Sequence, residues 1–341
     1  FKAVDIPCYG VRHGELRVVI GPNGAGKTTF CDLVSGKTRP STGKVYYDGR
    51  EITTMDESDI ALRGIGRKFQ TPTVFDSLTT YENLLLALPG NQGWKRNLLQ
   101  AETTEEANQI EEILERYPSS ISAGQQQRAS LARALVRKAD LYLLDEPMGQ
   151  LEPQLRSVLR VRLKQYLQVH QMTTVLVTHD QTEANALADR IAVMEDGELQ
   201  QFETPTQLKH KPANIYVGTF IGEPPMNTFS AQVKPAGKGF QFRLEETGEI
   251  LDYQAVDFQQ SLHDQLIKHK RIVLGLRPHA VKLGKGALKA QVISNQWLGD
   301  QSHIAAKFAN RIVVAISHQR EAFKLGENVP FHLEASDLHS Y

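Results

Sequence analysis

Apolar residues gather in short continuous runs along the chain up to about residue 200. Three of these runs are almost wholly apolar: "LRVVIG" at 16–21, "LYLLDE" at 141–146 and "TTVLVTHD" at 173–180. A strand with one face in water alternates apolar and polar residues, whereas a strand covered on both faces does not. Because helical stretches separate the runs, the pattern predicts an α/β domain built on a buried parallel sheet.

Two Asp-Gly pairs interrupt β-rich segments of this first part. Asp48-Gly49 stands between "KVYY" and "REI", and Asp196-Gly197 stands between "RIAVME" and "ELQQF". Asp-Gly readily adopts the two left-handed conformations that a tight hairpin turn needs. We therefore expect a β-hairpin at each pair.

The composition then marks an insertion and a second domain. From about 76 to 125 the chain is helical and polar, which predicts a helical insertion in the α/β domain. At "FIGEPPMN" (220–227) Gly and Pro break regular structure, and six or so short β-type runs with Gly-bearing turns follow. The prediction is an α/β domain over 1–217 and a small all-β barrel or sandwich over 218–341.

Bulk composition narrows the class of protein only slightly. Lys+Arg and Asp+Glu balance at 39 each, so bulk charge gives no reason to expect a nucleic-acid partner. Cys8 and Cys31 have no metal-type spacing, which favours a reduced cytosolic protein. The longest apolar candidate, "NLLLALPG" at 83–90, is less than half a membrane span. Any work at a membrane is therefore expected to go through a partner.

The segment "GPNGAGKT" at 21–28 fits G-x-x-x-x-G-K-[ST] and directly follows the predicted strand "LRVVI". Its glycines let backbone N–H groups wrap phosphates, Lys27 reaches the β and γ oxygens, and the Thr28 hydroxyl ligates Mg²⁺. Kinases, GTPases and motor ATPases share this loop, so it does not name the protein. The residues expected to contact the nucleotide are Gly21, Pro22, Asn23, Gly24, Ala25, Gly26, Lys27, Thr28 and Thr29.

The other predicted strands end in polar residues that suit phosphoryl transfer. Asp145 is expected to ligate Mg²⁺, and Glu146 to orient or deprotonate the attacking water. His179 follows the strand "VLVT", so we expect it at the same sheet edge, in contact with the γ-phosphate. Gln70, in "GRKFQTPTVF", is a candidate for contact with the metal or water. Positioning and charge neutralisation are most of what this reaction requires.

Taken in order, the P-loop, Gln70, "ISAGQ" (121–125), "LYLLDEP" (141–147) and His179 resemble the nucleotide-binding subunit of ABC transporters, over nearly all of 1–217. The resemblance implies an ABC ATPase dimer in which Ser122, Gly124 and Gln125 of one subunit close over the ATP of the other. It also implies that the Gln70 loop and the helical insertion press on a membrane subunit. The fold implied is an α/β P-loop NTPase with a helical insertion and a C-terminal OB-like barrel.

Two importer groups share the resemblance. Residues 1–90 look like ATPases of urea and branched-chain amino acid importers. Residues 117–341, including "LGLRPHAVKL" (274–283), look like ATPases of sugar and glycerol-phosphate importers of the maltose type, whose C-terminal barrel is often regulatory.

The chain departs from the family pattern in four places. "EEILERYPSSIS" is several residues shorter than the family's segment, and Ala123 replaces a glycine of the signature. In "MGQLEP", Gly149 and Glu152 stand where the family has serine and aspartate. The aromatic that stacks on adenine in the family either falls at the very edge of this sequence, where Phe1 is the candidate, or is missing.

The leading expectation is an ATP- and Mg²⁺-dependent ATPase that powers the import of a small solute. The solute class expected first is a sugar or glycerol phosphate. The expected partners of the ATPase are a second ATPase subunit, identical or not, permease subunits and, indirectly, an extracytoplasmic solute-binding protein, with no nucleic acid. Its expected place is the cytoplasmic face of the cell membrane. The alternatives are a urea or branched-chain amino acid importer ATPase, or an ATP-binding regulatory protein with weak hydrolysis. A kinase or GTPase leaves "ISAGQQQR" unexplained, and a DNA-maintenance ABC ATPase needs a coiled coil or second P-loop.

Overall fold

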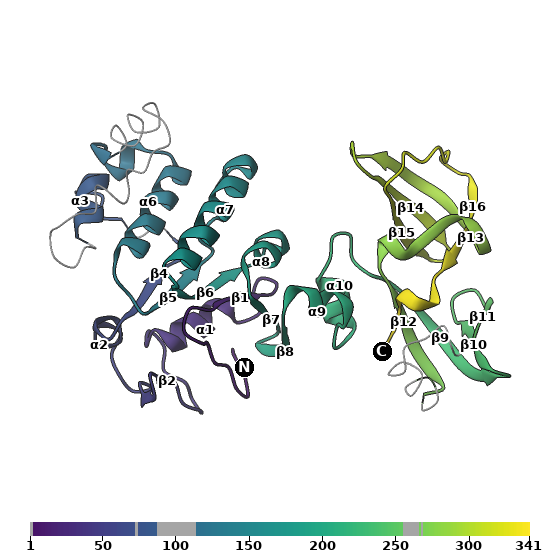
Figure 1. The fold of residues 1–341 in the computed structure, drawn as a ribbon, viewed down its shortest axis with the longest axis horizontal. Coiled ribbons are helices and arrows are strands. Elements are labelled where there is room, and N and C mark those ends of the chain that lie inside the picture. Colours follow the sequence, from purple (N-terminus) through teal and green to yellow (C-terminus); the bar gives the residue numbers. More distant parts are fainter. Residues whose placement is uncertain (1–2, 72–73, 87–113, 255–265, 267–268) are drawn as a thin grey trace. The chain divides into compact units, whose positions relative to one another are not determined.

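The computed structural model describes residues 3–71, 74–86, 114–254, 266 and 269–341. The chain divides into two compact units, Phe1–Gln207 and Leu208–Tyr341. The boundary predicted from the sequence lies ten residues later, between 217 and 218. The division into a nucleotide-binding and a regulatory domain at that point stays a prediction. Figure 1 shows the α/β elements of the first unit in purple to teal and the β-rich second unit in green to yellow.

A six-stranded sheet in the order β4-β5-β6-β1-β7-β8 forms the centre of the first unit. The four pairs from β4 to β7 are parallel, and the β7–β8 pair is antiparallel. The three predicted buried strands are β1, β5 and β6, and every residue in them is buried. The predicted parallel sheet is confirmed. The strands are β1 (Leu16–Ile20), β4 (Ile65–Lys68), β5 (Leu141–Asp145), β6 (Thr173–Thr178), β7 (Arg190–Glu195) and β8 (Glu198–Glu203).

Both predicted Asp-Gly hairpins are present. Asp48 and Gly49 have φ of 47° and 71° and join the short pair β2 (Tyr46–Tyr47) and β3 (Arg50–Glu51). Asp196 and Gly197, with φ of 48° and 84°, join β7 to β8. Both residues of each pair take the left-handed conformation that the turn requires.

Helices follow most strands of the first unit, as the alternating pattern predicted. They are α1 (Lys27–Val34), α2 (Glu57–Leu62), α3 (Thr80–Leu85), α6 (Ala123–Val136), α7 (Pro153–Val169), α8 (Gln181–Leu187), α9 (Pro205–His210) and the short η1 (Pro118–Ser120).

Part of the predicted helical insertion, residues 87–113, lies outside the described residues. Its described flanks are helical and packed, because α3 contacts α6. Thr79 and Glu82 form a capping box at the start of α3. The buried Asn83 amide donates to the carbonyls of Phe75, Leu78 and Thr79 and so fixes the loop that precedes the helix.

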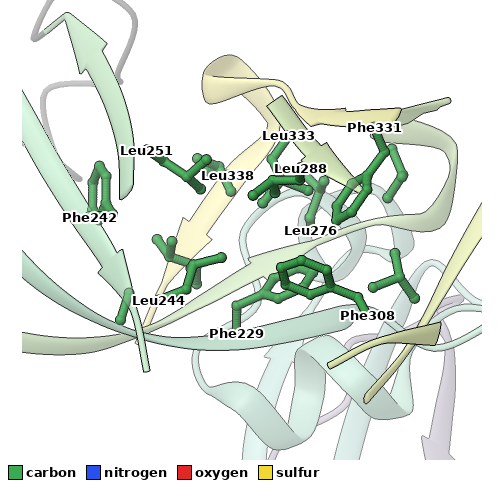
Figure 2. Packing of buried hydrophobic residues seen from close by; sticks show 14 of the residues in the cluster. Phe229, Phe242, Leu244, Leu251, Leu276, Leu288, Phe308, Phe331, Leu333 and Leu338 are labelled. Atoms are coloured by element: carbon green, nitrogen blue, oxygen red, sulfur yellow. The ribbon is translucent and has the colours of Figure 1, made fainter. Parts of the chain in front are cut away.

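The second unit consists of two antiparallel sheets, in the orders β11-β10-β9-β12-β17 and β15-β14-β13-β16. One hydrophobic cluster draws side chains from both sheets, with Phe229 against Phe308 and Phe308 against Phe331 (Figure 2). Two sheets that share one core pack face to face, in agreement with the predicted small all-β barrel or sandwich. The elements are α10 (Ile215–Phe220), β9 (Asn227–Ala236), β10 (Gly239–Leu244), β11 (Ile250–Gln254), β12 (Arg271–Leu276), η3 (Pro278–Ala280), β13 (Val281–Trp297), β14 (Ser302–Phe308), β15 (Arg311–Ser317), β16 (Asn328–Leu333), η4 (Ala335–Asp337) and β17 (Leu338–Ser340).

Among the described residues, no helix has the length and apolar character needed to cross a membrane.

Candidate functional site

The predicted phosphate loop joins the end of β1 to the start of α1. Gly26 has φ of 88°, and a Cβ there would lie 2.4 Å from the carbonyl oxygen of Ala3. A Cβ on Gly21 would lie equally close, 2.4 Å, to the carbonyl oxygen of Met194. Only glycine fits at both positions, because neighbouring backbone packs closely against each of them.

The side chain of Lys27 lies inside this loop. Its Nζ donates to the carbonyl oxygens of Gly21 and Pro22, both at 2.8 Å. Burial lowers the pKa of Lys27, and the carboxylates of Glu146 and Asp145 oppose that shift. The loop therefore holds a cation in its interior, where the sequence predicts the phosphates.

Asp145 ends β5 and is 1% exposed. Burial raises the pKa of its carboxyl, while Arg67, with Nη2 3.7 Å from Oδ2, and the Thr28 hydroxyl act in the opposite direction. By distance and angle neither carboxylate oxygen has a hydrogen-bond partner within the described part of the chain, so the Thr28 hydroxyl lies near Asp145 without a well-formed bond to it. Hydrogen bonds usually offset the hydration that a buried carboxylate loses, and Asp145 lacks them.

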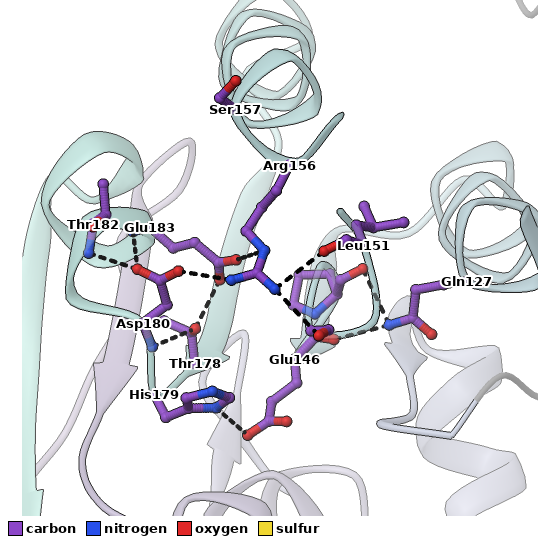
Figure 3. A network of polar contacts seen from close by, with 12 residues as sticks. Gln127, Glu146, Leu151, Arg156, Ser157, Thr178, His179, Asp180, Thr182 and Glu183 are labelled. Carbon is purple, nitrogen blue, oxygen red and sulfur yellow. Dashed lines mark hydrogen bonds and ion pairs between the residues drawn. The ribbon is translucent and has the colours of Figure 1, made fainter. Parts of the chain in front are cut away.

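Glu146 brings together the three residues predicted to be catalytic. Its Oε1 lies 3.0 Å from Nδ1 of His179, and its Oε2 accepts a hydrogen bond of 3.1 Å from Nε2 of Gln70. The three residues follow the ends of the neighbouring strands β5, β6 and β4. Figure 3 shows the Glu146 and His179 side chains turned toward each other.

Two contacts to the backbone of Glu146 were not predicted from the sequence. The Nζ of Lys68, a residue only 1% exposed at the end of β4, donates to the carbonyl oxygens of Asp145 (3.2 Å) and Glu146 (3.3 Å). Gln127 Nε2 donates to the Glu146 carbonyl at 2.9 Å. Burial lowers the pKa of Lys68 to about 8, against the pull of both carboxylates. A single lysine in "GRKF" carries no spacing signal that would have revealed this role.

Arg156 on α7 links two further loops of the site (Figure 3). Its Nη1 lies 3.1 Å from Oδ2 of Asp180, and its Nη2 donates to the carbonyls of Gly149 and Leu151, both at 3.3 Å. Asp180 caps the start of α8 directly after His179, which ties the 149–151 loop to the loop of that histidine. Sequence reasoning missed this contact too.

The predicted signature residues lie at the start of α6. Ser122 and Gln125 form a capping box, with Ser122 Oγ accepting from the Gln125 N–H and Gln125 Oε1 accepting from the Ser122 N–H. Ser122 is exposed. Both of these bonds are local to the start of the helix.

Gly149 and Glu152, which replace the serine and aspartate of the family pattern, cause no local conflict. A Cβ at Gly149 would meet Glu146 Oε2 at 3.7 Å, which is ordinary contact. Glu152 is exposed and precedes α7, whose first residue is Pro153. Phe1, the candidate for adenine stacking, lies outside the described residues.

Fold and site together define a P-loop ATPase with an added all-β domain, and comparison with known proteins agrees. The family model described as ABC transporter matches residues 8–149, and the TOBE domain model matches residues 274–340. The sn-glycerol-3-phosphate import ATP-binding protein UgpC of Pectobacterium atrosepticum is 30% identical over 97% of this chain and 90% of its own length. The xylose/arabinose import ATP-binding protein XacK of Haloferax volcanii is 32% identical over 90% of this chain and 79% of its own length.

The chain therefore belongs to the ABC transporter family. Within that family it is an ATP-binding subunit of an import system, an ATPase coupled to transport, as the sequence predicted. A solved dimeric structure of the ATP-binding cassette MJ0796 in a post-hydrolysis state with ADP and Pi shares 27% identity, covers 57% of this chain and 88% of that chain, and has a TM-score of 0.49.

Proposed function

We propose that this chain hydrolyses ATP to power the uptake of a small solute of the sugar or glycerol-phosphate type through partner membrane subunits. The hydrolysis is supported above all by one observation, the bonding of Glu146 to both His179 and Gln70 at the sheet edge that carries the P-loop. The solute class is supported by similarity that spans both units, to relatives named for glycerol 3-phosphate and for xylose and arabinose import.

In the proposed reaction the P-loop residues 21–29 bind the phosphates through backbone N–H groups, and Lys27 neutralises charge on the β and γ oxygens. Glu146 accepts the proton of the attacking water. His179 holds Oε1 of Glu146 and contacts the γ-phosphate, while Gln70 holds Oε2. The glutamate is thereby oriented by a neighbour on each carboxylate oxygen.

The residues expected to hold Mg²⁺ suit that ion. Asp145 offers buried carboxylate oxygens that lack full hydrogen bonds within the described structure, and Thr28 offers an exposed hydroxyl at the start of α1. Oxygen ligands of this kind, completed by phosphate and water, are what Mg²⁺ prefers. Thr28, Asp145 and Gln70 would hold the ion, which supplies neutralisation of phosphate charge when bound.

A second ATP-binding subunit, identical or not, is proposed to complete the site. Ser122, Gly124 and Gln125 stand at the N-terminus of a 14-residue helix, where unpaired N–H groups favour an anion. Because Ser122 is exposed, the segment is open to the γ-phosphate held by a partner's P-loop.

The permease is proposed to contact the surface next to Gln70. There a hollow of about 100 Å³ is lined by a mixture of apolar, polar and charged side chains, among them Ile60, Phe69 and Arg137. The assembly would place the chain at the cytoplasmic face of the membrane, with a solute-binding protein contacted only indirectly and no nucleic acid involved.

The test is ATP-driven uptake by the chain reconstituted with its permease and binding protein in vesicles, using labelled glycerol 3-phosphate, xylose, urea and leucine. Accumulation of glycerol 3-phosphate or xylose supports the proposal. Accumulation of urea or leucine alone would support the second candidate, which the likeness of residues 1–90 to those importers favours. Nucleotide binding with negligible turnover would indicate a regulatory protein.

A further inference from the structure

The backbone of Glu146 is held in an unusual conformation. Its φ is 42°, in the left-handed region that residues with a side chain rarely adopt. Such a conformation costs free energy and persists only where surrounding contacts fix it. Outliers of this kind gather at functional sites, and this one belongs to the residue proposed as the general base.

Two side-chain donors from separate elements bond to the carbonyl oxygen of Glu146, which also accepts the N–H of Gly149 at 3.4 Å. Lys68 Nζ reaches it from the end of β4 at 3.3 Å, and Gln127 Nε2 reaches it from α6 at 2.9 Å. On the other side, the Glu146 N–H donates to the carbonyl of Val177 at 2.9 Å. Both peptide groups of Glu146 are therefore fixed, which limits the directions its side chain can take.

The Lys68 ammonium is poorly suited to a role in packing alone. The residue is 1% exposed, and removing an ammonium from water carries a large cost unless hydrogen bonds and charges compensate. Its bonds go to the consecutive carbonyls of Asp145 and Glu146, so they fix the turn between the two acidic residues. A charge-assisted bond is stronger than a neutral one, which suits a strained turn.

We infer that Lys68 is a positioning residue for ATP hydrolysis, with Gln127 as a second donor, and that it holds the turn at Asp145–Glu146 so that the Glu146 carboxylate meets the attacking water. This inference rests on the proposed function, in which Glu146 is the base. It adds a residue that acts through Glu146 without touching the nucleotide. Lys68 of β4 and Gln127 of α6 donate to the same carbonyl group, so the strand before Gln70 and the signature helix meet there.

The experiment is steady-state ATPase kinetics of the full chain with MgATP. Lys68→Met, which keeps the length of the side chain but removes the ammonium, should lower kcat roughly ten- to a hundredfold, the range that a charge-assisted hydrogen bond corresponds to. KM for ATP should stay within about twofold, because the P-loop makes the nucleotide contacts. Lys68→Arg should recover part of the rate. Lys138→Met, the same change at an exposed position, should match the wild type.

A double-mutant cycle separates a positioning role from a general structural one. In a Glu146→Gln background, Lys68→Met should cause no further loss of rate, since its effect passes through Glu146. Losses that multiply, a wild-type kcat for Lys68→Met, or equal losses of ATP binding and rate overturn the inference. If Lys68→Met does not fold, as thermal unfolding will show, Gln127→Met removes the other side-chain donor and is judged by the same criteria.

The same data distinguish this inference from the proposed function beneath it. A low rate for Glu146→Gln together with a wild-type rate for Lys68→Met removes only the role of Lys68. A wild-type rate for Glu146→Gln overturns the role of Glu146, and the inference with it.

Discussion

Nδ1 of His179 lies 3.0 Å from Oε1 of Glu146, although 33 positions separate the two residues in the chain. The contact exists because β5 and β6 are parallel neighbours, so that the residues after their last positions meet at one edge of the sheet. The same edge carries the P-loop after β1, which pairs with β6 on its other side. The proposed base and the proposed phosphate site are thus brought together by strand order.

Replacing Lys27 with alanine should abolish ATP-dependent activity. The side chain supplies the cation inside the P-loop, and loss of a charge aimed at the transferred phosphate costs roughly a hundredfold or more in rate. The measurement is phosphate release by the purified chain, with Lys138→Ala as the exposed control. Ordinary hydrolysis by Lys27→Ala would remove the P-loop assignment.

Glu146→Gln should trap an ATP-bound dimer. The amide retains the size of the side chain but cannot accept the proton of water, so ATP should remain bound between the closed subunits. Light scattering of the purified variant should show the mass of a dimer with MgATP and of a monomer without it. A persistent monomer with bound ATP, together with negligible wild-type turnover, would mean that the altered signature region does not complete the shared site.

Ser122→Arg should prevent dimer closure while ATP binding to a single subunit stays near normal. The larger side chain stands at the exposed start of α6, where the proposed partner nucleotide has to approach. Binding of a fluorescent ATP analogue and light scattering in the Glu146→Gln background separate the two effects. Loss of binding in the monomer would place Ser122 in the nucleotide pocket of its own chain.

Asn227→Ala should destabilise the second unit by roughly 2–3 kcal/mol, the usual cost of leaving buried polar groups unpaired. The Asn227 side chain is 7% exposed and bonds both ways with Val314, donating to its carbonyl and accepting from its N–H, each at 2.8 Å. Urea unfolding followed by circular dichroism measures the change, with exposed Asn328→Ala as the control. Equal stability of the two variants would contradict the prediction.

Acid should weaken the second unit through His339. Burial, and then the nearby Arg277, lower the pKa of His339 to about 4, from 6.5 in a free histidine, although Asp337 opposes the shift. Between these two values the unfolded chain binds more protons than the folded chain, so stability is present above about pH 6.5 and declines as the pH falls toward 4.

The free energy of unfolding at pH 5 should therefore fall by about 2 kcal/mol less in His339→Gln than in the wild type, relative to pH 7.5. His318→Gln, at an exposed position, serves as the control and should follow the wild type. An identical pH dependence in all three proteins would show that His339 does not carry the effect.

The local features of the fold could be read from the sequence because their causes are local. Continuous apolar runs indicated β1, β5 and β6, and the Asp-Gly pairs indicated both hairpins. A Cβ at Gly21 or Gly26 would collide with backbone, so the loop requires glycine at both positions of the motif. Gln70, Glu146 and His179 were also identified from the sequence as site candidates, and their catalytic roles stay predictions.

The contacts that orient the site were decided by the tertiary structure. Lys68 bonds to carbonyls 77 and 78 positions away, Gln127 to one 19 positions away, and Arg156 to a carboxylate 24 positions away. Each bond depends on which strands are neighbours and on how α6 and α7 are placed against them, and no residue spacing encodes those arrangements. The nucleotide loop and the chemistry at the strand ends follow from the sequence alone, because each lies within one short segment. Tertiary packing decided how Glu146 is held, because its partners come from three separate elements.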